Sequence, residues 1–255
     1  MMGRISGGNR SPTAMKQTVG LKPEISILVP IHNEEEALPA LLDKIRQYQM
    51  AGWHRLCEWI FIDDGSTDRS PEILRQHLPL IQILSIRRRS GMGRALKLGS
   101  GLARGDFVVW MDGDGTYDFR DLMRLLSRRH EADQVIGCRR RDCGCFGPLR
   151  FAVKRLTAFG ASILMGRWIP DLNCGLRVLR SASVGRWCRL LPNEFCSTTA
   201  TLAALAAGQK VVFEPVSYGS RVRGSVSKFH PVKDGLHVLN QIFQVWLWRR
   251  ELKSV

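Results

Sequence analysis

Two aspartates separated by a single glycine follow an apolar run in the stretch VVWMDGDGTY, residues 108–117. When this pattern ends a strand, alternate residues point the same way, so both carboxylates are directed toward one point. Mg²⁺ and Mn²⁺ prefer such oxygen ligands and usually share them with substrate phosphates. Glycines at 113 and 115 let the backbone approach a ligand closely. Asp112 and Asp114 therefore predict a cation site under a diphosphate; the alternative is an acidic turn.

A second acidic segment, DDGSTD at 63–68, also follows an apolar run. A carboxylate at Asp63 or Asp64 can accept a hydrogen bond from a nucleobase N–H or a ribose hydroxyl. Ser66 or Thr67 would instead cap a helix, with Asp68 in its first turn. The segment RRRSGMGRALKLG, residues 87–99, places glycines and bases before a helix N-terminus, an arrangement that suits an anionic group.

Alternating strands and helices must position these residues. Continuous apolar runs predict strands, and apolar positions three and four residues apart predict helices between them. Strands that are apolar throughout favour a parallel sheet covered on both faces, in which ligands bind beyond the carboxyl ends of the strands. The expected strands are 25–30, 58–64, 81–86, 106–112 and 134–138, and the expected helices are 34–49, 68–78, 93–103 and 118–130.

The second half of the chain is less regular. It predicts an amphipathic basic helix at 147–168, a short strand at 174–181, a small-residue helix at 196–208, a strand at 209–218 and a last helix at 230–253. We expect a flexible basic tail over 1–23 and one domain over 24–255. Within that domain we expect two halves, 24–138 and 139–230, and a C-terminal amphipathic helix at 231–249.

The chain is strongly basic, with a net charge of +15 and a pI near 10.2. Such a charge attracts nucleic acid, an anionic membrane leaflet or a phosphorylated substrate, or it belongs to a protein that is merely basic.

The sequence shows no secretory signal pattern and no run of roughly 18 apolar residues, so we expect a cytoplasmic protein, free or on a membrane surface. Seven scattered cysteines favour reduced thiols over the metal cluster that Cys138, Cys143 and Cys145 suggest.

Six segments occur in an order that resembles family 2 glycosyltransferases, in particular the polyprenyl-phosphate (dolichyl-phosphate) mannose or glucose synthases. The resemblance covers roughly residues 24–240. It implies a GT-A fold, with a mainly parallel sheet flanked by helices and a Rossmann-like N-terminal half. It also implies a catalytic domain over 24–255, with a nucleotide-sugar donor bound by the half at 24–138, an acceptor bound by the half at 139–230, and a divalent cation, Mg²⁺ or Mn²⁺. The segments are VPIHNEEEAL, FIDDGSTDRS, SGMGRALKLG, WMDGDGTY, DLNCGLRVLRS and RVRGSVSKFHPVKDGL.

The resemblance also assigns roles in the donor site. Asp112 and Asp114 would hold the metal against the donor diphosphate. Two positions differ from the family pattern: Thr116 stands where mannose synthases often have a metal-contacting glutamine, and His32 replaces a more usual tyrosine. The other donor-binding residues are expected to be Pro30, His32, Glu34, Asp63, Asp64, Gly91, Gly93 and Arg94.

On the acceptor side, the resemblance implies that basic residues grip the lipid phosphate. The candidate catalytic residues are Asp171, Asp114 and Arg139. Asp171 would orient the acceptor and pair with Arg177; the alternative is that Asp171 and Arg177 form only a structural ion pair. Each arginine alone could equally be a solvated surface charge. The candidate acceptor-phosphate residues are Arg139, Arg155, Arg177, Arg221 and Lys228.

A chemical argument favours a phosphate acceptor. A sugar hydroxyl needs a general base, whereas a phosphate is already an anion and needs positioning and charge neutralisation. The two Arg-Trp pairs, at 167–168 and 186–187, lack the preceding glutamine of a Q-x-x-R-W motif, which argues against processive polysaccharide synthases.

We therefore predict an inverting, metal-dependent transfer of a sugar from a UDP- or GDP-linked donor to a polyprenyl phosphate, undecaprenyl or dolichyl. The enzyme would lie peripherally on the cytoplasmic face of a membrane, with the 147–168 and terminal helices on an anionic leaflet, unless both helices merely pack in the core. A separate membrane protein subunit is a further expected partner, and nucleic acid is not. The alternatives are a glycosyltransferase with a soluble or glycan acceptor and a non-catalytic protein that keeps the fold.

Overall fold

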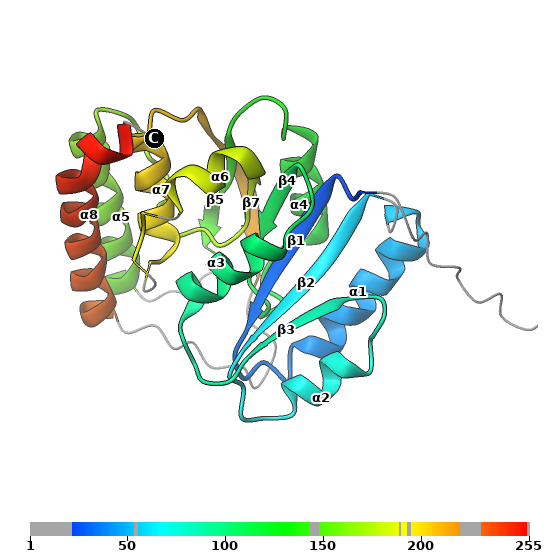
Figure 1. Ribbon diagram of the computed structural model, residues 1–255. Coiled ribbons are helices and arrows are strands. Elements are labelled where there is room, and N and C mark those ends of the chain that lie inside the picture. Colours follow the sequence, from blue (N-terminus) through cyan, green and yellow to red (C-terminus); the bar gives the residue numbers. More distant parts are fainter. Residues whose placement is uncertain are drawn as a thin grey trace, which may run out of the picture.

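A computed structural model of the chain describes residues 22–53, 56–142, 148–188, 190–192, 195–219 and 231–253. Within them a seven-stranded sheet has the order β3-β2-β1-β4-β6-β5-β7, flanked by helices (Figure 1). All strand pairs are parallel except those of β6, which is antiparallel to both β4 and β5. The strands are β1 Ile25–Ile31, β2 Cys57–Asp64, β3 Gln82–Ile86, β4 Phe107–Trp110, β5 Gln134–Asp142, β6 Arg177–Arg180 and β7 Val211–Tyr218.

The helices follow the expected alternation, with one addition. A short helix, α6, directly follows β6, where the sequence analysis placed no helix. The helices are α1 Leu38–Met50, α2 Ser70–Arg75, α3 Met92–Leu102, α4 Phe119–Ser127, α5 Pro148–Met165, α6 Ser181–Trp187, α7 Ser197–Ala206 and α8 Pro231–Lys253. None of the helices in the described ranges is long and apolar enough to cross a membrane.

The reversed strand β6 is the antiparallel part of a sheet that was predicted to be mainly parallel, and the structure confirms that prediction. All four β6 residues are buried or half-buried, and a strand covered on both faces has the same apolar pattern in either direction. The register places Arg177, at the start of β6, opposite Trp110, at the end of β4. The loop that precedes β6 therefore reaches the edge of the sheet at which β4 ends.

Both faces of the sheet are covered because successive strand side chains point to opposite sides. On one face, Gly99 of α3 lies against Ile62 and Leu28. On the other, Phe119 of α4 stacks on Trp59 of β2 at a ring-centroid distance of 5.7 Å. Helices α5, α7 and α8 contact one another, and Figure 1 shows them as a group on the side of the molecule away from α1 and α2.

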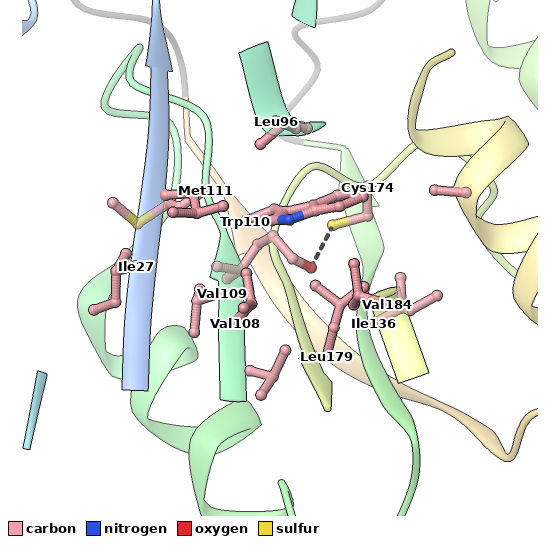
Figure 2. Packing of buried hydrophobic residues seen from close by; sticks show 14 of the residues in the cluster. Ile27, Leu96, Val108, Val109, Trp110, Met111, Ile136, Cys174, Leu179 and Val184 are labelled. Carbon is pink, nitrogen blue, oxygen red and sulfur yellow. Dashed lines mark hydrogen bonds between the residues drawn. The ribbon is translucent and has the colours of Figure 1, made fainter. Parts of the chain in front are cut away.

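The core is continuous around Trp110, which is 2% exposed. Figure 2 shows this side chain among Leu96 of α3, Ile136 of β5, Cys174 and Val184 of α6. Its ring also lies 6.2 Å from that of Trp187. The strand that the two candidate metal ligands follow is thus fixed by contacts from α3, β5, α6 and the loop before β6.

Glu58 is a buried acid at the start of β2 that joins three segments of the chain. Its Oε1 accepts hydrogen bonds from the Ser26 hydroxyl at 2.6 Å and the Arg104 N–H at 2.8 Å, and its Oε2 accepts from the Arg104 guanidinium and from Gln82. Burial acts to raise the pKa of Glu58, but these hydrogen bonds hold it below its ordinary value. The ionised form is therefore the one that the fold stabilises.

We predict that Glu58→Gln lowers the free energy of unfolding by about 1–3 kcal/mol at neutral pH, because it weakens the charged hydrogen bonds that this buried side chain accepts. Urea unfolding by circular dichroism measures this. Since the folded pKa is lowered, the difference from the wild type should shrink as the pH falls through that pKa. Glu131→Gln is the matched control, because its ion pair with Arg128 is exposed to solvent and contributes little to stability. Equal losses for both variants would contradict the prediction.

Candidate functional site

A cavity of about 330 Å³ opens at the edge of the sheet where β1, β2 and β4 end. It contains most of the donor-site residues predicted from the sequence, namely Pro30, His32, Glu34, Asp64, Gly91, Asp112 and Asp114. Six further residues complete its lining without having been predicted to bind the donor: Ile31, Arg89, Met92, Gly113, Asn173 and Ser197.

The β1 end of the cavity is fastened to the loop that follows β2. His32 makes a 2.9 Å hydrogen bond from Nδ1 to the backbone carbonyl of Asp64, so Nδ1 carries the proton. Asn33 accepts from the Thr67 N–H at 2.8 Å and donates to the Thr67 hydroxyl at 3.2 Å. Ser66 and Thr67 thus hold the β1 loop and do not cap α2, which begins at Ser70. The capping interpretation of Ser66 and Thr67 is therefore wrong.

Asp63 and Asp64 are both buried and make hydrogen bonds inside the protein. Asp63 accepts from the Ser66 N–H at 3.0 Å and does not line the cavity. Asp64 lines it, while its carboxylate accepts from the N–H and hydroxyl of Ser90 and from the Gly91 N–H at 2.7–2.8 Å. Asp64 therefore holds the loop before α3 in place as well as facing the cavity.

The two aspartates after β4 both face the cavity, and each is held in a different way. Asp114 is 4% exposed, and its Oδ1 accepts hydrogen bonds from the hydroxyl and the N–H of Thr116. Asp112 lies against Gly175: a β-carbon at position 175 would be 2.2 Å from its Oδ2. The Gly175 N–H donates to the Tyr117 hydroxyl at 2.9 Å, which fixes this close approach.

The carboxylates of Asp112 and Asp114 suit a hard divalent cation, because Mg²⁺ and Mn²⁺ are typically held by one or two carboxylates together with substrate phosphates. Among the described residues there is no group of three or more His, Cys, Asp or Glu side chains placed to hold a metal. A cation at this position would thus need further oxygen ligands from the substrate or water. Arg89 and the amino end of α3 line the same cavity, and both favour an anionic group there.

Asp171 and Arg139 form a buried ion pair next to the cavity, and neither lines it. The guanidinium donates to both carboxylate oxygens of Asp171 at 2.8 and 2.9 Å, and the Lys154 ammonium lies 3.6 Å from Oδ2. Burial acts to raise the pKa of Asp171, but the charge and hydrogen bonds of Arg139 and the charge of Lys154 hold it below its ordinary value. A base of this kind accepts protons poorly.

The predicted pairing of Asp171 with Arg177 is wrong, because Arg139 takes that place. Arg177 is fully buried and donates to the carbonyls of Cys174 and Ser197, with its guanidinium 5.6 Å from the centre of the Trp110 ring. Burial lowers its pKa. Its contacts join the loop before β6 to α7, which is a structural arrangement rather than a phosphate-binding one.

Three further predicted residues, Gly93, Arg94 and Arg155, do not line this cavity. Gly93 is buried within α3 and Arg94 is exposed on the same helix. Arg155 lies on α5, where its guanidinium is 5.9 Å from the centre of the Phe151 ring. Arg221 and Lys228 fall outside the described residues, as do Cys143 and Cys145, while Cys138 is buried in β5.

The cavity residues that the sequence analysis missed had partial signals. Arg89 belongs to the basic run before α3, which was expected to bind an anion as a whole. Asn173 lies in the DLNCGL segment that supplied Asp171, but nothing in the pattern separated the two. Ser197 gave no signal, since it begins an ordinary small-residue helix.

A family model described as Glycosyl transferase family 2 matches residues 26–186. The chain belongs to glycosyl transferase family 2. The match begins within β1 and ends within α6, and it includes all the cavity residues but Ser197.

Two of the relatives are named as enzymes that transfer sugars to polyprenyl phosphates. The chain is 29% identical over 217 residues to a dodecaprenyl-phosphate galacturonate synthase of Rhizobium johnstonii, which covers 81% of this chain and 62% of that protein. It is 32% identical over 230 residues to an undecaprenyl-phosphate 4-deoxy-4-formamido-L-arabinose transferase of Aeromonas hydrophila, covering 87% of this chain and 66% of that one. The chain thus spans less than the full length of these relatives.

Solved structures confirm the expected GT-A fold. Glucosyl-3-phosphoglycerate synthase of Mycobacterium tuberculosis, in complex with Mn²⁺, UDP and phosphoglyceric acid, matches with a TM-score of 0.67 at 18% identity, over 89% of this chain and 78% of that one. TarS of S. aureus with UDP-GlcNAc matches with a TM-score of 0.59 at 16% identity, over 90% and 70% of the two chains.

We predict that Gly175→Ala weakens binding of UDP with Mn²⁺ by about tenfold or more while the protein remains folded. The added methyl group would occupy the space of the Asp112 carboxylate. Because the aspartate side chain is flexible, it can move away without unfolding the protein, but the carboxylate then no longer lies where it would bind the cation. Isothermal titration calorimetry measures the affinity. Gly185→Ala in α6, where a β-carbon meets nothing within 4 Å, is the control and should bind normally. Unchanged affinity in Gly175→Ala would contradict the proposed crowding of Asp112.

Proposed function

We propose that this chain is an inverting, metal-dependent glycosyltransferase that moves a sugar from a nucleotide-sugar to a polyprenyl phosphate. The observation that carries the proposal is the cavity in which Asp112 and Asp114 lie beside Arg89 and the start of α3. Two carboxylates beside basic and amide groups suit a cation and a diphosphate together. The names of the curated relatives support the lipid phosphate as acceptor.

In this proposal the donor nucleotide-sugar occupies the cavity. Pro30, His32 and Glu34 lie at the end of β1, where a nucleoside would fit, and Asp64 faces the same space. Asp112 and Asp114 would hold Mg²⁺ or Mn²⁺, which neutralises charge on the leaving nucleoside diphosphate. UDP and GDP both fit this description.

The acceptor phosphate attacks the anomeric carbon from the side opposite the leaving diphosphate, which inverts the configuration in one displacement. This attack needs no general base, because the phosphate oxygen is already ionised. The buried ion pair of Asp171 and Arg139 agrees with that chemistry. The Asp171 carboxylate is 1% exposed and its lowered pKa keeps it ionised, so it is poorly suited to act as a general base. Asp171 then acts by holding Arg139 in place. It also holds the loop at the cavity wall, because it accepts a 3.0 Å hydrogen bond from the N–H of Asn173.

The lipid chain would lie along α5. A second cavity of about 690 Å³ is lined by apolar residues of α5 and the following loop, among them Leu156, Phe159 and Trp168, with Arg155 as its basic member. Pro170 of this lining directly precedes Asp171. An apolar groove that ends beside the Arg139 and Lys154 cluster suits a hydrocarbon chain with an anionic head.

Helices α5 and α8 would rest on the anionic cytoplasmic face of a membrane. They contact each other, and both expose large apolar side chains to solvent, which marks an interaction surface. Arg249 lies 4.8 Å from the centre of the Trp246 ring, a combination suited to lipid headgroups. The exposed apolar residues are Phe151, Leu156, Phe159, Ile163 and Leu164 on α5, Trp168 after it, and Leu236, Leu239, Phe243 and Leu247 on α8.

The direct test incubates the protein with Mn²⁺, a panel of UDP- and GDP-sugars and undecaprenyl phosphate. We expect release of UDP or GDP together with a new lipid-linked sugar. Asp114→Asn should lower the rate about a hundredfold or more, because charge on the leaving group is no longer neutralised. Asp43→Asn, an exposed aspartate on α1, is the control. Transfer to a soluble acceptor such as phosphoglycerate, with no lipid product, would overturn the choice of acceptor.

We predict that Leu156→Glu reduces binding to anionic phosphatidylglycerol vesicles by about tenfold or more, since burying a leucine contributes about 1.5–3 kcal/mol. Co-sedimentation measures the bound fraction, and neutral phosphatidylcholine vesicles should bind the wild type more weakly. The control is Leu102→Glu at the end of α3, where another exposed leucine lies outside α5 and α8. Equal binding by both variants would contradict a membrane-facing α5.

A further inference from the structure

Thr116 is a buried residue whose hydroxyl is directed at one of the two candidate metal ligands. It is 3% exposed, and its Oγ1 donates to Asp114 Oδ1 at 2.6 Å. Its backbone N–H donates to the same oxygen at 3.1 Å. Two donors on one oxygen restrict rotation of the Asp114 carboxylate about its Cβ–Cγ bond.

Thr116 is itself held from a distant part of the chain. Its carbonyl accepts a 2.9 Å hydrogen bond from the N–H of Gly219, the residue after β7. The neighbouring Tyr117 packs edge-on against Tyr218 at a ring-centroid distance of 5.6 Å. A β-branched side chain on a fixed backbone has few rotamers, so the direction of the Thr116 hydroxyl is well defined.

We propose that Thr116 is a positioning residue that orients Asp114 for a divalent cation and thereby sets the affinity for that cation. Residues that hydrogen-bond to a ligating carboxylate fix its orientation, and their loss typically lowers metal affinity about 10–100-fold. Thr116 would therefore contribute to cation binding indirectly, because its hydroxyl holds the Asp114 carboxylate in place. The inference rests on the proposed function only in requiring that Asp112 and Asp114 hold a cation.

The main competing explanation is that the hydrogen bond serves only to shape the turn after β4. That role would affect folding stability and would leave cation affinity unchanged in a folded variant. The backbone N–H of Thr116 reaches the same oxygen without the hydroxyl, so the turn keeps one of its two hydrogen bonds when the side chain changes. The hydroxyl can therefore be removed with the turn still supported.

The test measures Mn²⁺ binding by electron paramagnetic resonance and by calorimetry, in the presence of UDP. Thr116→Val keeps the shape of the side chain and removes the donor, and we expect it to weaken Mn²⁺ binding about tenfold or more. Thr116→Ser keeps the donor and should recover most of the affinity. In turnover assays, Thr116→Val should raise the Mn²⁺ concentration for half-maximal rate more than it lowers kcat.

The control is Thr157→Val on α5. Thr157 is also buried, and its hydroxyl donates to the carbonyl of Val153 within the helix. Thermal unfolding of each variant shows that it is folded, and Thr116→Ala replaces Thr116→Val if the valine does not fold. A folded Thr116→Val that binds Mn²⁺ as tightly as the wild type overturns the inference alone. If the wild type binds Mn²⁺ no better than Asp114→Asn, the metal site of the proposed function fails, and the inference with it.

Discussion

The candidate site depends on the antiparallel pairing of β6 with β4. Because Arg177 lies opposite Trp110, the loop before β6 is brought to the edge of the sheet where β4 delivers Asp112. This loop supplies Asn173 to the cavity and the Gly175 backbone against the Asp112 carboxylate. With β6 in the opposite direction, the same loop would lie at the far edge and the cavity would lack this wall.

The acids at the strand ends combine ligand-facing and structural roles. Asp64 faces the cavity and holds the loop before α3, whereas Asp63 and Asp171 make their hydrogen bonds inside the protein. A buried carboxylate without donors is costly, so each of them is placed where N–H, hydroxyl or guanidinium groups converge. The loops around the cavity are therefore held by the same kind of residue that would bind the substrate, which limits how far composition alone can separate the two roles.

Residues in the first half of the chain were predicted well because the local pattern carries the information. Apolar strands followed by acids at 63–64 and 112–114 lie where the sequence placed them, since parallel strands bring their carboxyl ends to one edge. Predictions that required a partner from elsewhere fared less well. Asp171 pairs with Arg139 rather than Arg177, and Ser66 and Thr67 bind Asn33 instead of capping α2. In both cases several partners were chemically equivalent, and only their distances in space distinguish them.

The sequence by itself determined the fold class, the family and the acids at the strand ends, because these follow from short-range patterns and from motifs in order. Only the tertiary structure decided the direction of β6, the partner of Asp171, and the contacts of Asp112 with Gly175 and of Thr116 with Gly219. The physical reason is that a buried strand has the same apolar pattern in either direction, and that a hydrogen bond or close contact depends on distances between segments that lie far apart in the chain.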